Sequence, residues 1–216
     1  MSKTKAMSVS EQLGAIASTM QAVAHKKNRD DLAARLDSVT DKLADKSVKA
    51  VVVGQFKQGK SALVNALVSA PVCPVDDVIA TAVPTVVKWG VEPHAALVTK
   101  IDGSKDKAIH TEVDPRRLRR HVTDLAGESG FLGHLHAEVE LPRRLLAEGV
   151  VLVDTPGVGR GHSRAATNLT LLPQADVAIM VSDVTQELTD PELNFLKQAS
   201  ALCPRVACVE IGRAHV

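Results

Sequence analysis

Gly54-Gln-Phe-Lys-Gln-Gly-Lys-Ser61 is the stretch that decides the fold of this 216-residue chain. It fits the pattern G-x-x-x-x-G-K-[ST] and follows the short apolar run at residues 48–53, which predicts a buried strand. Inward-pointing backbone N–H groups and the N-terminus of the next helix would cradle a phosphate chain there. In this pattern Lys60 reaches the β- and γ-phosphates, and the hydroxyl of Ser61 binds Mg²⁺. The stretch therefore predicts a P-loop domain that holds a triphosphate and magnesium.

A second motif, Asp154-Thr155-Pro156-Gly157, comes directly after the apolar residues 150–153. A strand that ends in D-x-x-G is typical of the second switch of GTPases. Its carboxylate holds the magnesium shell, and its glycine amide senses the γ-phosphate. Together the two motifs exclude most P-loop kinases and indicate a GTPase.

Between the motifs a threonine should close over the metal, and Ala80-Thr-Ala-Val-Pro-Thr85 offers two. Thr81 follows a loop, where a mobile switch belongs, whereas Thr85 has the position of an ordinary strand residue, so we predict Thr81. The predicted metal ligands are then Ser61, Thr81 and Asp154, and the predicted catalytic residues are Lys57, Lys60 and Thr81. The predicted nucleotide-binding residues are Gly54, Gln55, Phe56, Lys57, Gln58, Gly59, Lys60, Ser61, Ala62, Asp154, Thr155, Pro156 and Gly157.

Apolar patterning extends this reading to a whole domain. Strands are predicted at residues 48–53, 83–90, 95–102, 134–140, 149–153, 176–182 and 205–209. Helices are predicted at 60–69 and from Asp114-Pro115 and Asp190-Pro191 onward. The alternation predicts an α/β fold with a mostly parallel, doubly wound sheet. Two apolar stripes in residues 9–45 predict a helical hairpin before it, either packed on the domain or part of a larger bundle.

The composition limits the partners of the chain. The chain has 26 Lys and Arg against 25 Asp and Glu, so its composition lacks the excess of positive charge that is typical of nucleic-acid-binding proteins. Three cysteines without metal-like spacing indicate a reduced, cytoplasmic protein, and the N-terminus lacks the apolar region of a signal peptide. No apolar run approaches the roughly 18–20 residues that span a bilayer. We expect any membrane contact to be peripheral, at the inner face of the plasma membrane.

The P-loop segment up to Leu67, residues 80–85, residues 154–158 and residues 175–190 resemble bacterial dynamin-like proteins. The resemblance covers about residues 10–209 and is strongest to the isoniazid-inducible dynamin-like proteins of actinobacteria. It implies a GTPase domain at 47–209 that binds GTP and Mg²⁺, dimerises through its nucleotide face and acts in membrane remodelling. It also implies that helices within 1–46 belong to a neck bundle, and that the lipid-binding segments of the family follow the GTPase domain.

Two departures from related GTPases concern hydrolysis. Val158 stands where small GTPases keep a water-orienting glutamine, so hydrolysis cannot rest on that residue. A nucleotide-gated scaffold with little hydrolysis therefore stays open as an alternative. Phe56 and Lys57 stand where eukaryotic dynamins carry Gln and a cation-holding Ser. Lys57 either supplies positive charge to the leaving oxygens or is a solvated loop lysine.

A third departure concerns the base. The guanine-reading motif [NT]-K-x-D should follow the strand at 205–209, but the chain reads Glu210-Ile-Gly-Arg-Ala-His-Val216. Residues 211–216 match the translation of a common sequencing-library adapter. We therefore interpret 210–216 as a non-native tail and the GTPase domain as incomplete. An Era-type assembly GTPase is a further alternative, but the RNA-binding basic domain expected of it is not evident, and we expect no nucleic-acid partner.

Overall fold

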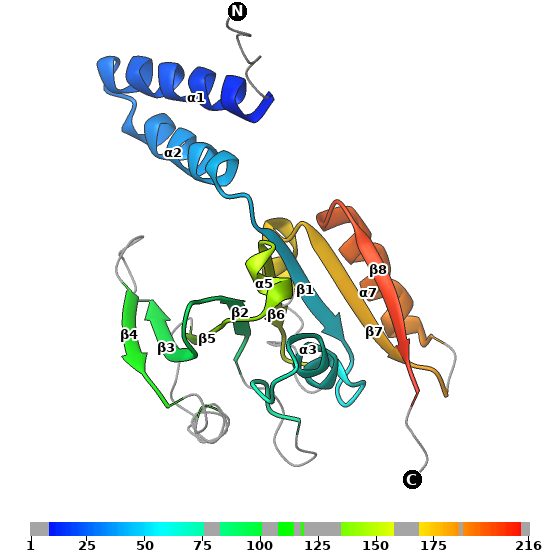
Figure 1. Ribbon diagram of the computed structural model, residues 1–216. Coiled ribbons are helices and arrows are strands. Elements are labelled where there is room, and N and C mark those ends of the chain that lie inside the picture. The colour runs from blue at the N-terminus through cyan, green and yellow to red at the C-terminus, as the bar shows by residue number, and fades with distance from the viewer. Residues whose placement is uncertain are drawn as a thin grey trace, which may run out of the picture. The chain divides into compact units, whose positions relative to one another are not determined.

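The computed structural model describes residues 9–75, 83–100, 108–114, 118, 135–157, 169–185 and 188–212. The chain divides into two compact units, Met1–Ser47 and Val48–Val216. In the first, helix α1 (Val9–Lys26) and helix α2 (Asp30–Ala44) form the predicted hairpin (Figure 1). Asn28, in the left-handed conformation at φ 54°, turns the chain between them. Small side chains are buried in the hairpin, while the larger apolar residues of α1 are about half exposed: Leu13, Ile16, Met20 and Val23.

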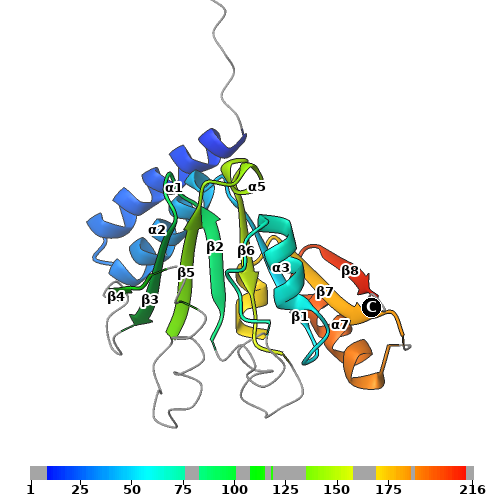
Figure 2. The same ribbon diagram turned by 60° about the horizontal axis from the view of Figure 1, so that its bottom comes forward.

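The second unit is built on one eight-stranded sheet in the order β4-β3-β5-β2-β6-β1-β7-β8 (Figure 2). The strands are β1 (Val48–Gly54), β2 (Thr85–Trp89), β3 (His94–Lys100), β4 (Ala108–Glu112), β5 (Leu135–Leu141), β6 (Val150–Asp154), β7 (Val177–Asp183) and β8 (Val206–Ile211). Four of its seven strand pairings are parallel, including both neighbours of β1, and three are antiparallel. The predicted α/β fold with a mostly parallel sheet is confirmed.

Helices cover the sheet on both faces (Figures 1 and 2). Helices α3 (Lys60–Val68) and α5 (Arg144–Ala147) lie on one face, and the 3₁₀ helix η1 (Leu172–Gln174) and helix α7 (Asp190–Leu202) on the other. Side chains of β1 alternate between the two resulting cores. Val52 packs in the core that contains Val64 of α3, whereas Val51 and Val53 pack in the core that contains Phe195 of α7. The sheet is therefore doubly wound, as predicted.

The structure differs from the sequence prediction at the edges of the sheet. Strand β4 was not predicted, because all five of its residues are exposed and the segment carries no apolar alternation. Its main-chain pairing with β3 defines it instead. At the other edge, β8 continues two residues past the predicted end, with Glu210 and Ile211 paired to Ser182 and Asp183 of β7. Most of the helix predicted from Asp114-Pro115 onward lies outside the described residues, but its Leu118 is described and is buried.

Core packing on β6 gives a stability prediction. Leu152→Ala should lower the free energy of unfolding by about 2–5 kcal/mol, because its side chain is 2% exposed and its loss leaves a cavity. The control is Leu67→Ala on α3, where the leucine is 42% exposed. This substitution should change the free energy of unfolding by about 1 kcal/mol or less. Urea unfolding followed by the single tryptophan, Trp89, measures both variants. Equal losses would contradict the placement of Leu152.

Candidate nucleotide-binding site

The P-loop connects β1 to α3 through two glycines whose backbone conformations disfavour other residues. Gly59 caps α3 in the left-handed conformation, with φ 88° and ψ 13°. Gly54 has φ 148°, and a Cβ atom added there would lie 2.4 Å from the carbonyl oxygen of Val181 on β7. The first glycine thus lets the loop start against β7, and the second turns it into the helix. This is the strand–loop–helix context that the sequence pattern requires.

Lys60 points into the loop rather than into solvent. Its side chain is 6% exposed, and its Nζ donates a hydrogen bond of 2.6 Å to the carbonyl oxygen of Gln55. Burial lowers the pKa of Lys60 to about 8, opposed by the charge of nearby Asp154. Because burial of the Lys60 ammonium is only partly compensated by Asp154, binding of an anion at the loop is favourable. A phosphate chain in the cradle would supply that anion.

The two motifs meet at Ser61 and Asp154. Ser61 Oγ donates a 2.6 Å hydrogen bond to Asp154 Oδ2, although the residues are 93 positions apart. They meet because β6 pairs with β1 in parallel, with Asp154 in register with Val52. Asp154 is fully buried, and burial raises its pKa to about 6 against the opposing effects of Ser61, Lys60 and the Cys73 thiol. Two of the three predicted metal ligands are therefore adjacent.

Two polar atoms beside this contact have no hydrogen-bond partner among the described residues. Asp154 Oδ1 and Thr85 Oγ1 are buried without a hydrogen bond to any part of the chain that the structure describes. Thr85 begins β2, directly opposite Asp154 in the antiparallel β2–β6 pairing, so their side chains share a face of the sheet. Buried polar atoms without partners cost about 1–3 kcal/mol each. A hydrated Mg²⁺, which prefers carboxylate oxygens and keeps several waters, fits this position.

Thr85 is a residue that the sequence argument set aside. It is a strand residue, as its position indicated, but the strand register brings it to Asp154. A single sequence does not reveal that register, so no local signal marked Thr85. Thr81, which we preferred as the third metal ligand, lies outside the described residues, as does Val158.

The D-x-x-G segment runs against the P-loop. Thr155 Oγ1 donates a buried 2.7 Å hydrogen bond to the carbonyl oxygen of Val52 on β1. Gly157 follows, and a Cβ atom added to it would lie 2.7 Å from Phe56 Cα and 3.2 Å from Lys60 Nζ. Thr155, Pro156 and Gly157 are all buried. The glycine is thus required because a side chain would collide with the P-loop backbone.

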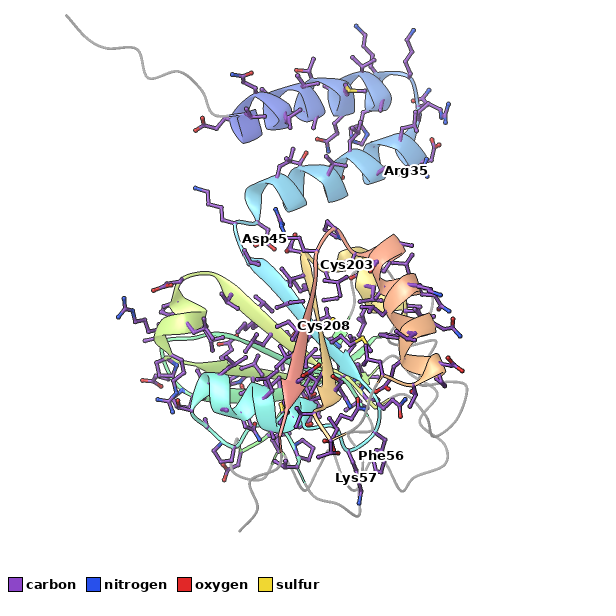
Figure 3. All side chains as sticks on the ribbon, turned by 90° about the vertical axis from the view of Figure 1, so that its right-hand side faces the viewer. Arg35, Asp45, Phe56, Lys57, Cys203 and Cys208 are labelled. Atoms are coloured by element: carbon purple, nitrogen blue, oxygen red, sulfur yellow. The ribbon has the colours of Figure 1, made fainter. Side chains whose placement is uncertain are left out.

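Lys57 and Phe56 lie on the outer side of the loop. Lys57 is exposed, in the left-handed conformation at φ 66°, with Nζ 5.7 Å from the centre of the Phe56 ring. Both side chains point away from the body of this unit (Figure 3). The other two loop residues, Gln55 and Gln58, reach back to Thr189 and Glu192 at the start of α7. The sequence analysis assigned no role to Thr189 and Glu192, although T-x-x-E at the start of a helix is a recognisable capping signal.

The close approach of Gly157 to the P-loop gives a second prediction. Gly157→Ala should lower the free energy of unfolding by about 1–3 kcal/mol, because the added methyl group must displace the backbone of Phe56. The matched control is Gly212→Ala, whose added Cβ would lie 3.3 Å from the Val184 side chain and meet no backbone atom of the described residues. It should stay within about 0.5 kcal/mol of the wild type. If urea unfolding gave equal values for the two variants, the packing of D-x-x-G on the P-loop would be wrong.

Comparison with known proteins agrees with this geometry. The model of the dynamin family matches residues 50–203. The isoniazid-induced protein IniA of Mycobacterium tuberculosis is 39% identical over 193 residues, which are 87% of this chain and 29% of IniA. The bacterial dynamin-like protein of Nostoc punctiforme is 27% identical over 154 residues, 68% of this chain and 22% of that protein.

Among solved structures, a chain of an oligomerised bacterial dynamin pair has the same fold, with a TM-score of 0.59 at 24% sequence identity. The match covers 83% of this chain and 28% of that one. The chain thus spans less than a third of the length of each of these three relatives. Because the family match extends over most of the sequence and contains both the P-loop and D-x-x-G, the chain belongs to the dynamin family, as a bacterial dynamin-like protein.

Proposed function

We propose that this chain binds GTP with Mg²⁺ and hydrolyses the β–γ phosphoanhydride bond, and that the cycle drives dimerisation and membrane remodelling. The observation that carries the proposal is the 2.6 Å contact between Ser61 and Asp154 beside the buried Lys60. This places a hydroxyl, a carboxylate and an ammonium at the mouth of a glycine-containing loop of the kind whose backbone N–H groups bind phosphate. The family supports a GTPase over other phosphate-binding activities.

Each residue has a role in this proposal. Lys60 leaves the carbonyl of Gln55 and binds the β- and γ-phosphate oxygens, while Ser61 and Asp154 hold the metal. Bound Mg²⁺ neutralises the negative charge that develops between the β- and γ-phosphates. In this proposal the Gly157 amide contacts the γ-phosphate, and Thr81 closes over the metal as its third protein ligand. Catalysis then rests on positioning and electrostatic stabilisation, since Val158 has no group to orient water.

Dimerisation and membrane action are supported by the relatives. The solved dynamin pair is described as oligomerised and as a means of sensing and tethering membranes. In the described parts of this chain, no helix has the length and apolar character needed to cross a bilayer. We propose a cytoplasmic protein whose membrane contact is peripheral and made by lipid-binding segments outside this chain. In this proposal residues 1–46 contribute to a neck bundle and residues 47–209 to the GTPase domain.

The P-loop assignment predicts the effect of two substitutions. Lys60→Ala should weaken the binding of a fluorescent GTP analogue by about 10- to 100-fold, because a charge-assisted phosphate contact is lost. Ser61→Asn should remove most of the dependence of binding on Mg²⁺. Lys197→Ala, on the exposed side of α7, is the matched control and should bind like the wild type. Binding by Lys60→Ala as tight as in the wild type would refute the assignment.

The proposed role of Lys57 predicts how the rate of GTP hydrolysis depends on monovalent ions. If its ammonium replaces a bound cation, phosphate release by the complete protein should be nearly the same in potassium and in lithium. Lys57→Ser should be slower or should become potassium-dependent. Unchanged rates in that variant, with no new ion dependence, would show that Lys57 is a solvated loop residue. The same assay separates a GTPase from a scaffold that binds GTP without turnover.

A further inference from the structure

The back of the P-loop is hydrogen-bonded to the start of α7. Gln55 Nε2 donates to Thr189 Oγ1 at 2.9 Å, and Gln58 Nε2 donates to Glu192 Oε1. Each pair is 134 positions apart in the sequence. Thr189 is the N-cap of α7 and Glu192 its third residue, and they form a capping box. The cap of one helix therefore also holds the loop that begins another.

These four residues close into a ring of hydrogen bonds through their side chains and the backbone N–H of Gln55. Gln58 Oε1 accepts from the backbone N–H of Gln55 at 2.9 Å. Glu192 Oε2 accepts from both the hydroxyl and the backbone N–H of Thr189, each at 2.7 Å. The Thr189 hydroxyl, in turn, accepts from Gln55, which completes the ring. A network whose members all have partners is more rigid than its separate pairs.

Glu192 is buried more deeply than capping requires. It is 2% exposed, and its partners among the described residues are amide, hydroxyl and backbone N–H groups rather than cations. Burial by itself would raise its pKa, but the hydrogen bonds from Gln58 and Thr189 outweigh this effect and lower the pKa. Burial of an ionised carboxylate is unfavourable unless hydrogen bonds compensate it. A capping role alone does not explain why this carboxylate turns toward the P-loop.

The ring acts on the nucleotide site through Gln55. Its backbone N–H and its side chain belong to the ring, while its carbonyl oxygen accepts the hydrogen bond from Lys60 Nζ at 2.6 Å. On one side of it, Gly54 packs against the carbonyl of Val181. On the other, Phe56 packs against Gly157. The orientation of the Gln55 peptide, and with it the path of the cradle, is therefore fixed from α7.

We propose that Gln58 and Glu192 are positioning residues for the nucleotide: through them, the cap of α7 holds the P-loop in its phosphate-binding conformation. This inference rests on the proposed function. Because the loop surrounds the phosphate chain as a whole, loss of the link weakens GDP and GTP binding by the same factor. A residue that sensed the γ-phosphate would affect GTP alone.

The test is a double-mutant cycle on Gln58→Ala and Glu192→Ala. Gln58→Ala breaks the hydrogen bond to Glu192 and leaves the contacts of Thr189 with Gln55 and Glu192 in place, whereas Glu192→Ala removes the contacts of Glu192 with both Gln58 and Thr189. Dissociation constants for fluorescent GDP and GTP are measured, together with the free energy of unfolding without nucleotide. Gln198→Ala, an exposed glutamine of α7, is the matched control and should bind both nucleotides like the wild type.

We expect Gln58→Ala to weaken both nucleotides about five- to tenfold, with a smaller loss of unfolding free energy than Glu192→Ala because the helix cap is kept, and the double variant to bind no worse than Glu192→Ala. Additive effects, or a Gln58→Ala variant that binds like the wild type, would overturn the inference. If Glu192→Ala does not fold, Gln58→Ala decides alone, since it keeps the helix cap. A wild-type chain that binds no nucleotide would instead refute the proposed function.

Discussion

The hydrogen bond from Ser61 to Asp154 is the contact on which the site depends. It joins the first turn of α3 to the end of β6, and it forms because β6 lies beside β1 in parallel register. In such sheets the carboxyl ends of neighbouring strands meet at one edge, where loops can gather polar groups. A different strand order would leave both motifs intact in sequence and separate them in space. The strand register is therefore as necessary to the chemistry as the motif residues are.

The unfavourable burial of polar side chains at this edge of the sheet is offset by apolar packing on both faces of the sheet. Lys60, Thr85, Asp154 and Glu192 are all buried, and the first three lie around a single position. The fold tolerates them because two aliphatic cores, one on each face of the sheet, hold β1 and its neighbours in place. Groups whose partners are incomplete in the free chain are expected where a ligand completes them. The described site has that character at Asp154 and Thr85.

Sequence reasoning predicted the parts of this molecule that depend on local pattern. The α/β class, the hairpin and the dynamin family follow from apolar periodicity and from motifs such as that at Gly54–Ser61. Strand β4 was missed because exposed residues carry no periodic signal. Thr85 and Glu192 were missed as site residues for another reason: their positions depend on register and on contacts across 134 positions, which no local pattern contains.

The central claim is that the P-loop and D-x-x-G bind one metal ion together with a triphosphate. Diffraction from crystals grown with a non-hydrolysable GTP analogue and Mn²⁺ tests it most directly, because the anomalous signal of Mn²⁺ locates the ion independently of the protein. The account predicts a single strong peak beside the phosphates, next to Ser61 Oγ and on the carboxylate side of Asp154. A bound triphosphate whose metal peak lay away from these two residues would contradict it.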